Sequence, residues 1–162
     1  MTRIVAVDPD ACVACHQCEY VCAFRQTGDF QRSAAFIRVN FYPEERACVP
    51  LTCMHCDDAW CLEICPSGAI SRDAQTAAVV IDRTRCAGCK MCLLACPYGN
   101  IRFDPSSGVA GKCDLCDGDP ACVRTCGAGA LRFMEADELV ESRREAVDTL
   151  LRRSLRLDRG DR

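Results

Sequence analysis

Residues 86–97 read CAGCKMCLLACP and hold four cysteines with the spacing C-x2-C-x2-C-x3-C. Residues 12–22 repeat this spacing, whereas two looser groups read C-x2-C-x4-C-x3-C over 53–65 and C-x2-C-x5-C-x3-C over 113–126. Numbered along the chain, the groups are Cys12, Cys15, Cys18 and Cys22; Cys53, Cys56, Cys61 and Cys65; Cys86, Cys89, Cys92 and Cys96; Cys113, Cys116, Cys122 and Cys126. Only Cys48 lies outside them.

The order tight, loose, tight, loose indicates an internal duplication, with copies over about residues 8–70 and 82–131. The first copy has a longer connection, whose residues 35–42 are rich in β-branched and aromatic side chains and predict a strand. Residues 4–7, 78–82 and 101–103 predict further short strands, and 104–108 predict a turn. Regular structure is therefore expected to be sparse.

Cysteine supplies 17 of the 162 residues and is counted within the 49% hydrophobic content. Without cysteine the apolar share falls to about 38%, which predicts a thin core that needs another filling. The net charge of −3 gives no reason to expect nucleic acid as a partner. The sequence shows no signal-peptide pattern and no apolar run long enough for a membrane span, so we expect a reducing, cytoplasmic setting; export with a signal-bearing partner stays open.

The tight groups match a ligand pattern in which one loop holds three irons of a cubane and the fourth cysteine binds a second cluster. Zinc is the main alternative, but a zinc site uses two cysteine pairs or a pair with histidine, and the chain has only 2 His. The odd number of cysteines fits poorly with a complete set of disulfides. The spacing thus favours iron–sulfur clusters over zinc, and zinc over disulfides.

From about Asp8 to Phe133 the chain resembles the four-cluster, ferredoxin-like electron-transfer subunits of large molybdenum, tungsten and nickel enzymes. These include the iron–sulfur subunits of dimethyl sulfoxide reductase, formate hydrogenlyase, carbon monoxide dehydrogenase and tungsten aldehyde oxidoreductase systems. The resemblance implies an α+β fold made of tandem bacterial-ferredoxin-like folds with pseudo-two-fold symmetry. We expect a four-cluster domain over 1–134 and a C-terminal helical arm and tail over 135–162.

The same resemblance implies that group one pairs with group four and group two with group three. The implied ligand sets are quartet A (Cys12, Cys15, Cys18 and Cys126), quartet B (Cys22, Cys113, Cys116 and Cys122), quartet C (Cys53, Cys56, Cys61 and Cys96) and quartet D (Cys65, Cys86, Cys89 and Cys92). Each quartet would hold one [4Fe–4S] cluster, giving four clusters. The chain departs from the family where Trp60 stands in place of a residue such as proline.

Several residues near the ligands have a plain structural interpretation. We expect Cys48 to be a buried, unreactive thiol and Trp60 to be a core aromatic. The histidines and lysines that lie in or beside the groups are His16, His55, Lys90 and Lys112. For the histidines, solvated or packing roles are favoured over tuning of a cluster, and for the lysines a solvated surface is favoured over offsetting cluster charge.

Residues 135–159 contain no Cys, Gly or Pro and carry apolar side chains near helical spacing, which predicts one long helix. Such a helix could pack back on the cluster domain. We favour an arm that docks a catalytic subunit or another copy of this chain, since an apolar stripe needs a partner and this domain offers little core.

The predicted function is electron transfer within a multi-subunit oxidoreductase, between a catalytic Mo, W or Ni subunit and a second redox protein. An aldehyde oxidoreductase or carbon monoxide dehydrogenase type of enzyme is preferred, because its cluster subunits are as short as this chain. The sequence has no dinucleotide loop, phosphate loop or His/carboxylate cluster, so the chain by itself is not expected to be an enzyme. The alternatives are a freely diffusing polyferredoxin and a zinc-binding interaction module.

Overall fold

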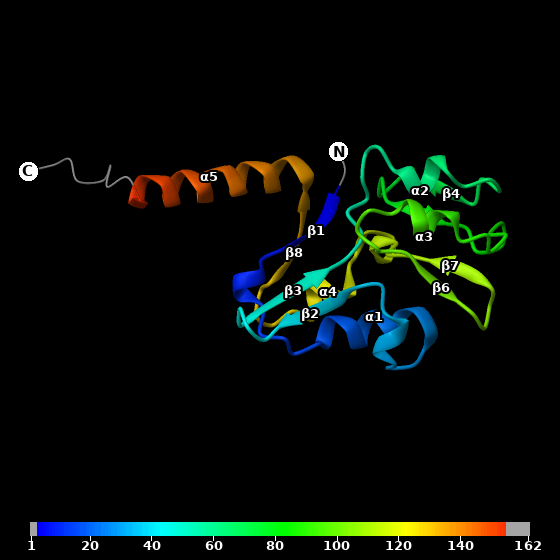
Figure 1. Cartoon of the computed structure of the whole chain (residues 1–162), viewed down its shortest axis with the longest axis horizontal. Helices are drawn as coiled ribbons and strands as arrows, with labels where there is room; N and C mark the ends of the chain where they lie inside the picture. Colours follow the sequence, from blue (N-terminus) through cyan, green and yellow to red (C-terminus); the bar gives the residue numbers. More distant parts are fainter. Residues whose placement is uncertain (1–2, 155–162) are drawn as a thin grey trace, which may run out of the picture.

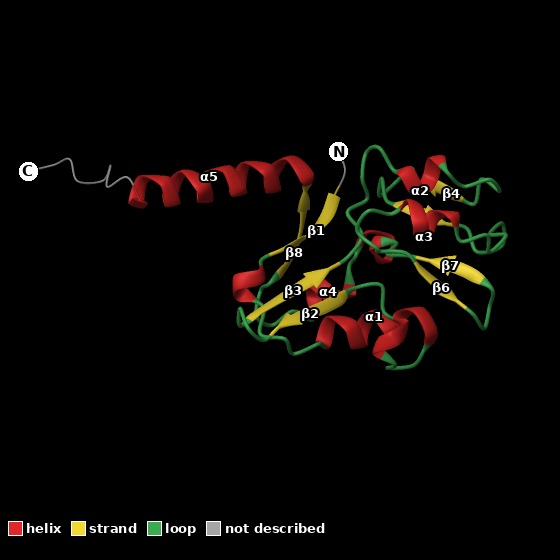
Figure 2. Ribbon diagram, in the orientation of Figure 1, coloured by secondary structure: helices red, strands yellow, loops and turns green. Residues whose placement is uncertain are grey.

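The computed structural model describes residues 3–154, which form small strand pairs, short helices and one long helix (Figures 1 and 2). The strands are β1 (Arg3–Val7), β2 (Arg38–Tyr42), β3 (Ala47–Leu51), β4 (Ile70–Arg72), β5 (Val79–Ile81), β6 (Arg102–Asp104), β7 (Val109–Gly111) and β8 (Leu131–Glu135). The α-helices are α1 (Gln17–Thr27), α2 (Trp60–Glu63), α3 (Met91–Ala95), α4 (Ala121–Arg124) and α5 (Ala136–Ser154). Single 3-10 turns are η1 (Pro9–Ala11), η2 (Arg32–Ala34) and η3 (Leu115–Gly118).

All described strands form two-stranded antiparallel sheets. Three pairs join neighbours in sequence, namely β2 with β3, β4 with β5 and β6 with β7, whereas β1 pairs with β8 from the far end of the domain. The register of the β1–β8 pair places Val5 opposite Phe133. The β1–β8 pair therefore brings the start of group one beside the end of group four, and the β4–β5 pair joins groups two and three.

The predicted strands over 4–7, 78–82 and 101–103 are present with small changes at their ends. The strand predicted over 35–42 is shorter, because β2 begins only at Arg38. Ala35 and Ile37 are fully buried, and the Phe36 N–H donates to Cys22 Sγ at 3.2 Å. This segment packs against group one instead of pairing with another strand, which explains its late entry into the sheet.

Buried apolar side chains form two main clusters, and cysteines contribute to both. One cluster includes Val5, Cys18, Leu115 and Leu131. The second includes Ile70, Val79, Cys92 and Ile101. The architecture is a ferredoxin-like α+β arrangement with little regular structure, as predicted; its pseudo-two-fold symmetry stays a prediction.

Helix α5 extends away from the body of the molecule (Figure 1). It begins one residue later than predicted, and residues 155–159 of the predicted helix lie outside the described part of the chain. Its first turn is anchored by Leu139, which packs with Ile4 and Ala6. Val147 and Leu150, further along the helix, are exposed. None of the described helices is long and apolar enough to cross a membrane.

Candidate iron–sulfur sites

The four predicted quartets line four separate cavities. The cysteines of quartets A, B, C and D each surround one cavity, and none of the four cavities is lined by a cysteine from another quartet. In every quartet, three cysteines come from one group and the fourth comes from its paired group. The fold thus brings together each set of thiols that the family resemblance implied.

The third cysteine of each group occupies the second position of a short or long helix. These cysteines are Cys18 in α1, Cys61 in α2, Cys92 in α3 and Cys122 in α4. The loops before α1 and α3 turn sharply, because His16 and Lys90 cap the two helices in the left-handed region. Such turns bend a loop around a centre while the helix fixes its third ligand, which is the shape that three ligands on one loop require.

Helix α1 links two adjacent cavities. Cys18 lines the cavity of quartet A and Cys22, four residues further along, lines that of quartet B. Residues four apart lie on one face of a helix, so one helix face serves both cavities. The negative charge of Cys18 as a thiolate contributes to raising the pKa of Cys122 in quartet B, which places the two quartets within electrostatic range.

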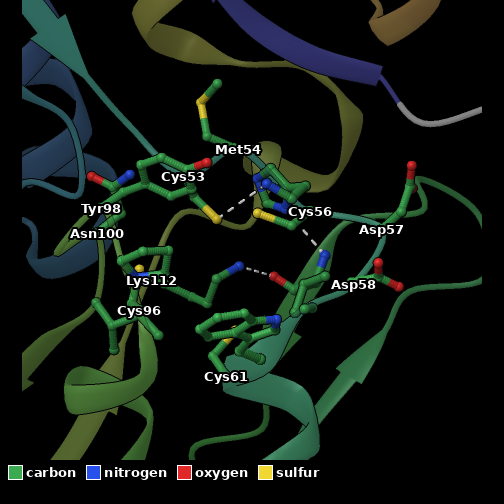
Figure 3. Close-up of a pocket in the computed structure, with 16 residues that line it drawn as sticks. Cys53, Met54, Cys56, Asp57, Asp58, Cys61, Cys96, Tyr98, Asn100 and Lys112 are labelled. Atoms are coloured by element: carbon green, nitrogen blue, oxygen red, sulfur yellow. Dashed lines mark hydrogen bonds between the residues drawn. The ribbon is translucent and has the colours of Figure 1, made fainter.

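Figure 3 shows the cavity of quartet C. Cys53, Cys56, Cys61 and Cys96 face it together with the ammonium-bearing side chain of Lys112. Trp60 also contributes to its wall. Its neighbours on either side are quartets B and D, because Cys53 influences the pKa of Cys113, and Cys61 that of Cys92.

Burial is the first cause of the high thiol pKa values at these cavities. It raises the pKa of Cys18 and of Cys113 to about 12, and that of Cys92 to about 11. Further cysteines nearby raise the pKa of Cys113 and Cys92 as well. A thiolate is the form that binds metal, so closely packed buried thiols need a cationic centre among them to ionise together.

Backbone N–H groups donate to cysteine sulfurs in three of the quartets. The N–H of Phe36 bonds to Cys22 Sγ at 3.2 Å, that of His55 to Cys53 Sγ at 3.4 Å, that of Ala110 to Cys86 Sγ at 3.4 Å and that of Leu115 to Cys113 Sγ at 3.5 Å. Hydrogen bonds to ligand sulfurs stabilise the thiolate and tune the potential of a bound cluster. The donor set therefore fits [4Fe–4S] clusters.

Cys48 and Trp60 differ from the sequence-based expectations. Cys48 lies in β3 opposite Phe41, is only half-buried, and lines none of the four quartet cavities. Trp60 is 65% exposed, so its prediction as a core aromatic is wrong. Trp60 is the first residue of α2, directly before Cys61, and both residues line the cavity of quartet C.

The prediction of a solvated surface role is wrong for Lys112, whereas His55 takes the packing role that was favoured together with a solvated one. His55 is 1% exposed and Lys112 is 4% exposed, and both line the cavity of quartet C. His16 and Lys90 are more accessible, as expected. The sequence carried no signal for this difference, because each pair of like residues occurs in a similar cysteine-rich setting and only long-range packing buries one member.

Comparison with known proteins identifies the cofactor class. Residues 45–138 match the family model of the 4Fe-4S dicluster domain. The chain is 38% identical over 134 residues to the polyferredoxin-like subunit of aliphatic sulfonate oxidoreductase from Pyrococcus furiosus, covering 80% of this chain and 76% of that protein. It is 34% identical over 146 residues to the thiosulfate reductase electron transfer subunit PhsB from Salmonella typhi, covering 81% and 74%.

Two other likenesses are more limited. The chain is 37% identical over 136 residues to the beta subunit of NADH-dependent phenylglyoxylate dehydrogenase from Aromatoleum evansii; this covers 80% of the chain but only 30% of that subunit. A chain of the BamBC active-site complex of benzoyl coenzyme A reductase aligns with a TM-score of 0.46 at 24% identity, covering 82% of this chain and 75% of that one.

The family match spans three of the four cysteine groups, and the curated relatives extend over most of the chain. Several of these relatives are named as electron-transfer or polyferredoxin-like subunits of oxidoreductases. With its cysteine spacing and the cavities that the cysteines line, the chain belongs to the 4Fe-4S dicluster domain family of iron–sulfur electron-transfer proteins.

Proposed function

We propose that this chain is a non-catalytic electron-transfer subunit that holds four [4Fe–4S] clusters, one in each of quartets A to D. The observation that carries the proposal is the partition of sixteen cysteines into four cavities with four thiols each. Each cluster, when bound, accepts and donates one electron. The chain's own contribution is to hold the four centres in a fixed order and to set their surroundings.

The proposed order of the centres is A, B, C and D. Thiols of adjacent quartets interact electrostatically through Cys18 with Cys122, Cys113 with Cys53, and Cys61 with Cys92. Each neighbouring pair of quartets therefore has one direct link, and the links join the quartets into a single line. Such a line suits passage of electrons from one end of the molecule to the other better than storage at one site.

The proposed partners are a catalytic Mo, W or Ni subunit and a second redox protein. Relatives of the chain include subunits of thiosulfate reductase, of phenylglyoxylate dehydrogenase and of formate hydrogenlyase. An aldehyde oxidoreductase or carbon monoxide dehydrogenase type of catalytic subunit remains our preferred partner. Helix α5 would serve as the docking arm for that subunit, because Val140, Val147 and Leu151 leave apolar surface beyond its anchored first turn.

Anaerobic purification of the tagged full chain from its own host tests this function. Iron and zinc are counted, and co-purifying proteins are identified by mass spectrometry. We expect about sixteen irons per chain together with a large metalloenzyme subunit. Each [4Fe–4S] centre needs four thiolate ligands, so sixteen cysteines would hold four centres with four irons each. The same iron without a partner would make the chain a diffusing ferredoxin, and a colourless, zinc-loaded chain would overturn the proposal.

Cysteine variants test the quartets one at a time. Cys126→Ser is expected to remove the centre of quartet A, although Cys126 lies far in sequence from the other three ligands. Cys48→Ser is the matched control and is expected to retain all the iron, because Cys48 lines none of the quartet cavities. Equal iron loss in the two variants would contradict the assignment.

A further inference from the structure

The four cavities differ in the charged and polar side chains buried beside them. Glu19, Thr52, His55 and Lys112 are the buried polar residues within the described part of the chain. His55 and Lys112 both line the cavity of quartet C. Glu19 instead follows Cys18 of quartet A. The interior is therefore electrostatically uneven along the line of quartets.

Lys112 places its amine inside the protein between quartets C and B. Its Nζ donates to the backbone carbonyl of Val79, and to that of Cys113 at 3.3 Å. Two carbonyl oxygens accept hydrogen bonds from the ammonium, and no carboxylate compensates its charge at these contacts. Because Lys112 lines the cavity of quartet C together with its four cysteines, this charge acts on a cluster held there.

His55 is a second polar residue that lines the same cavity. Its Nδ1 accepts a hydrogen bond from the Val79 N–H at 3.1 Å, so a neutral ring must carry its proton on Nε2. A protonated ring would carry a hydrogen on Nδ1 and could not accept this bond, so the ring is neutral. The Nε2 atom is buried and has no hydrogen-bond partner in the described chain.

A buried N–H without an acceptor is costly, and natural proteins rarely leave one unsatisfied. The missing acceptor of His55 is explained if the group in the cavity is itself an acceptor. The sulfides and thiolates of an iron–sulfur centre are acceptors, and hydrogen bonds to them raise the reduction potential because they stabilise the added negative charge. A nearby ammonium acts in the same direction.

Quartet A has the opposite surroundings. Glu19 is 1% exposed and directly follows Cys18 in the chain, so its carboxylate places a buried negative charge beside quartet A. Its oxygens accept from Arg32 Nε at 2.7 Å and from the Val39 N–H at 3.1 Å, and contact His16 Nδ1 at 2.7 Å. A negative charge beside a cluster disfavours an added electron, whereas a positive charge favours it.

We propose that Lys112 and the Nε2–H of His55 make the centre of quartet C the most readily reduced of the four, so that the first electron to enter the chain resides there. The inference rests on the proposed function, because it requires a cluster in each quartet. The electron arrives from a neighbouring centre in quartet B or D and leaves by the same kind of one-electron step. The line of centres thus has an electron-collecting position inside it instead of a uniform potential.

Redox titration of the holoprotein, followed by electron paramagnetic resonance, tests the proposal in the range where only one centre is reduced. At a fixed potential, Lys112→Met is expected to lower the ratio of the reduced to the oxidised form of the first centre at least tenfold. This change corresponds to a reduction potential lower by about 59 mV for a one-electron couple. Lys90→Met is the matched control, since Lys90 is the chain's other lysine and is exposed beside quartet D. Its effect should be clearly smaller because water screens its charge.

Histidine labelling gives a readout that needs no change in Lys112. With ¹⁵N confined to the imidazole rings of its only 2 His, pulsed resonance of the first reduced centre should show a nitrogen coupling. His55→Phe should abolish that coupling and lower the potential, whereas His16→Phe should leave the coupling in place. His55→Gln keeps both an acceptor for Val79 and a donor for the cavity, so it should recover much of the potential.

The outcomes separate this inference from the proposed function. A chain that lacks the expected iron refutes the function itself. A fully loaded chain whose first reduced centre shows no histidine coupling, or whose first potential is the same in Lys112→Met and the wild type, refutes only the assignment to quartet C. If Lys112→Met does not fold, the labelled wild-type protein still decides the matter.

Discussion

Arg3 holds Phe133 by two contacts across 130 positions of sequence. The guanidinium donates from Nη2 to the Phe133 carbonyl at 3.3 Å and lies 3.9 Å from the centre of the Phe133 ring. These contacts reinforce the β1–β8 pair, whose strands precede group one and follow group four. The pairing explains how Cys126 reaches the cavity of Cys12.

Disrupting this strand pair should remove one centre before the others. Val5 is 3% exposed and packs with Cys18 and Leu131, so Val5→Asp would bury an unpaired carboxylate and separate β1 from β8. We expect the iron content to fall by about a quarter, with loss of the quartet A signal, because one of the four proposed [4Fe–4S] centres is lost. Iron analysis with electron paramagnetic resonance measures both.

Arg3→Ala is the control for Val5→Asp. It removes only exposed contacts, which contribute about 0.5–1 kcal/mol at such sites, and full iron should be retained. A Val5→Asp protein with all its iron would contradict the structural role of the β1–β8 pair.

Gly88 should be far less replaceable than Gly99. Both have positive φ, of +67° and +63°, so alanine costs about 1–2 kcal/mol of backbone strain at either position. At Gly88, a Cβ atom would in addition collide with the carbonyl oxygen of Gly108, whereas nothing lies within 4 Å at Gly99. Gly88→Ala should therefore displace the loop between Cys86 and Cys89 and lose iron from quartet D.

If Gly99→Ala lost as much iron as Gly88→Ala, the strained backbone conformation alone would explain the loss, and the steric contact at Gly88 would have no role. Thermal unfolding of both variants gives the strain that they share, and iron per chain gives the effect specific to Gly88.

Trp60 is a built-in optical probe of quartet C. It is the chain's only tryptophan and lines the same cavity as Cys61. Cluster incorporation into the cluster-free chain should strongly quench its fluorescence, since the proposed centre of quartet C would lie beside the indole. Cys61→Ser should recover a larger share of the emission than Cys12→Ser, which affects the quartet at the far end of the line. Equal recovery would argue against the placement of Trp60 at quartet C.

Shortening α5 should show whether its anchored first turn and its exposed apolar surface have different roles. A chain that stops after Ser142 keeps Leu139 packed on Ile4 and Ala6 but lacks Val147 and Leu150. We expect full iron content and a smaller native complex in size-exclusion chromatography. Leu139→Ala should instead weaken the anchor and lower the free energy of unfolding by about 2 kcal/mol or more, while the docking surface stays intact. An unchanged complex size in the shortened chain would exclude the docking role, and loss of dimers alone would point to self-association.

The cysteine spacing by itself was sufficient to indicate the cofactor class. Spacings such as C-x2-C-x2-C-x3-C fix which thiols one loop can present, and this is a local property of the chain. The strand at 79–81 and the turn at 105–108 were likewise predictable, because β-branched residues and a Pro-Ser-Ser-Gly run determine them locally. The structure of the first part of residues 35–42, which packs against group one, was not predictable, because burial of Ile37 overrides its strand propensity.

Tertiary structure alone decided the surroundings of each quartet. His16 and His55 are alike in sequence context, yet only His55 is fully buried with an unpaired Nε2, because Val79 from β5 covers it and binds its Nδ1. Lys112 is buried for the same reason, through its bond to the Val79 carbonyl. Spacing along the chain determines which atoms can bind a cluster, whereas the electric field at that cluster sums over residues that only the fold brings together.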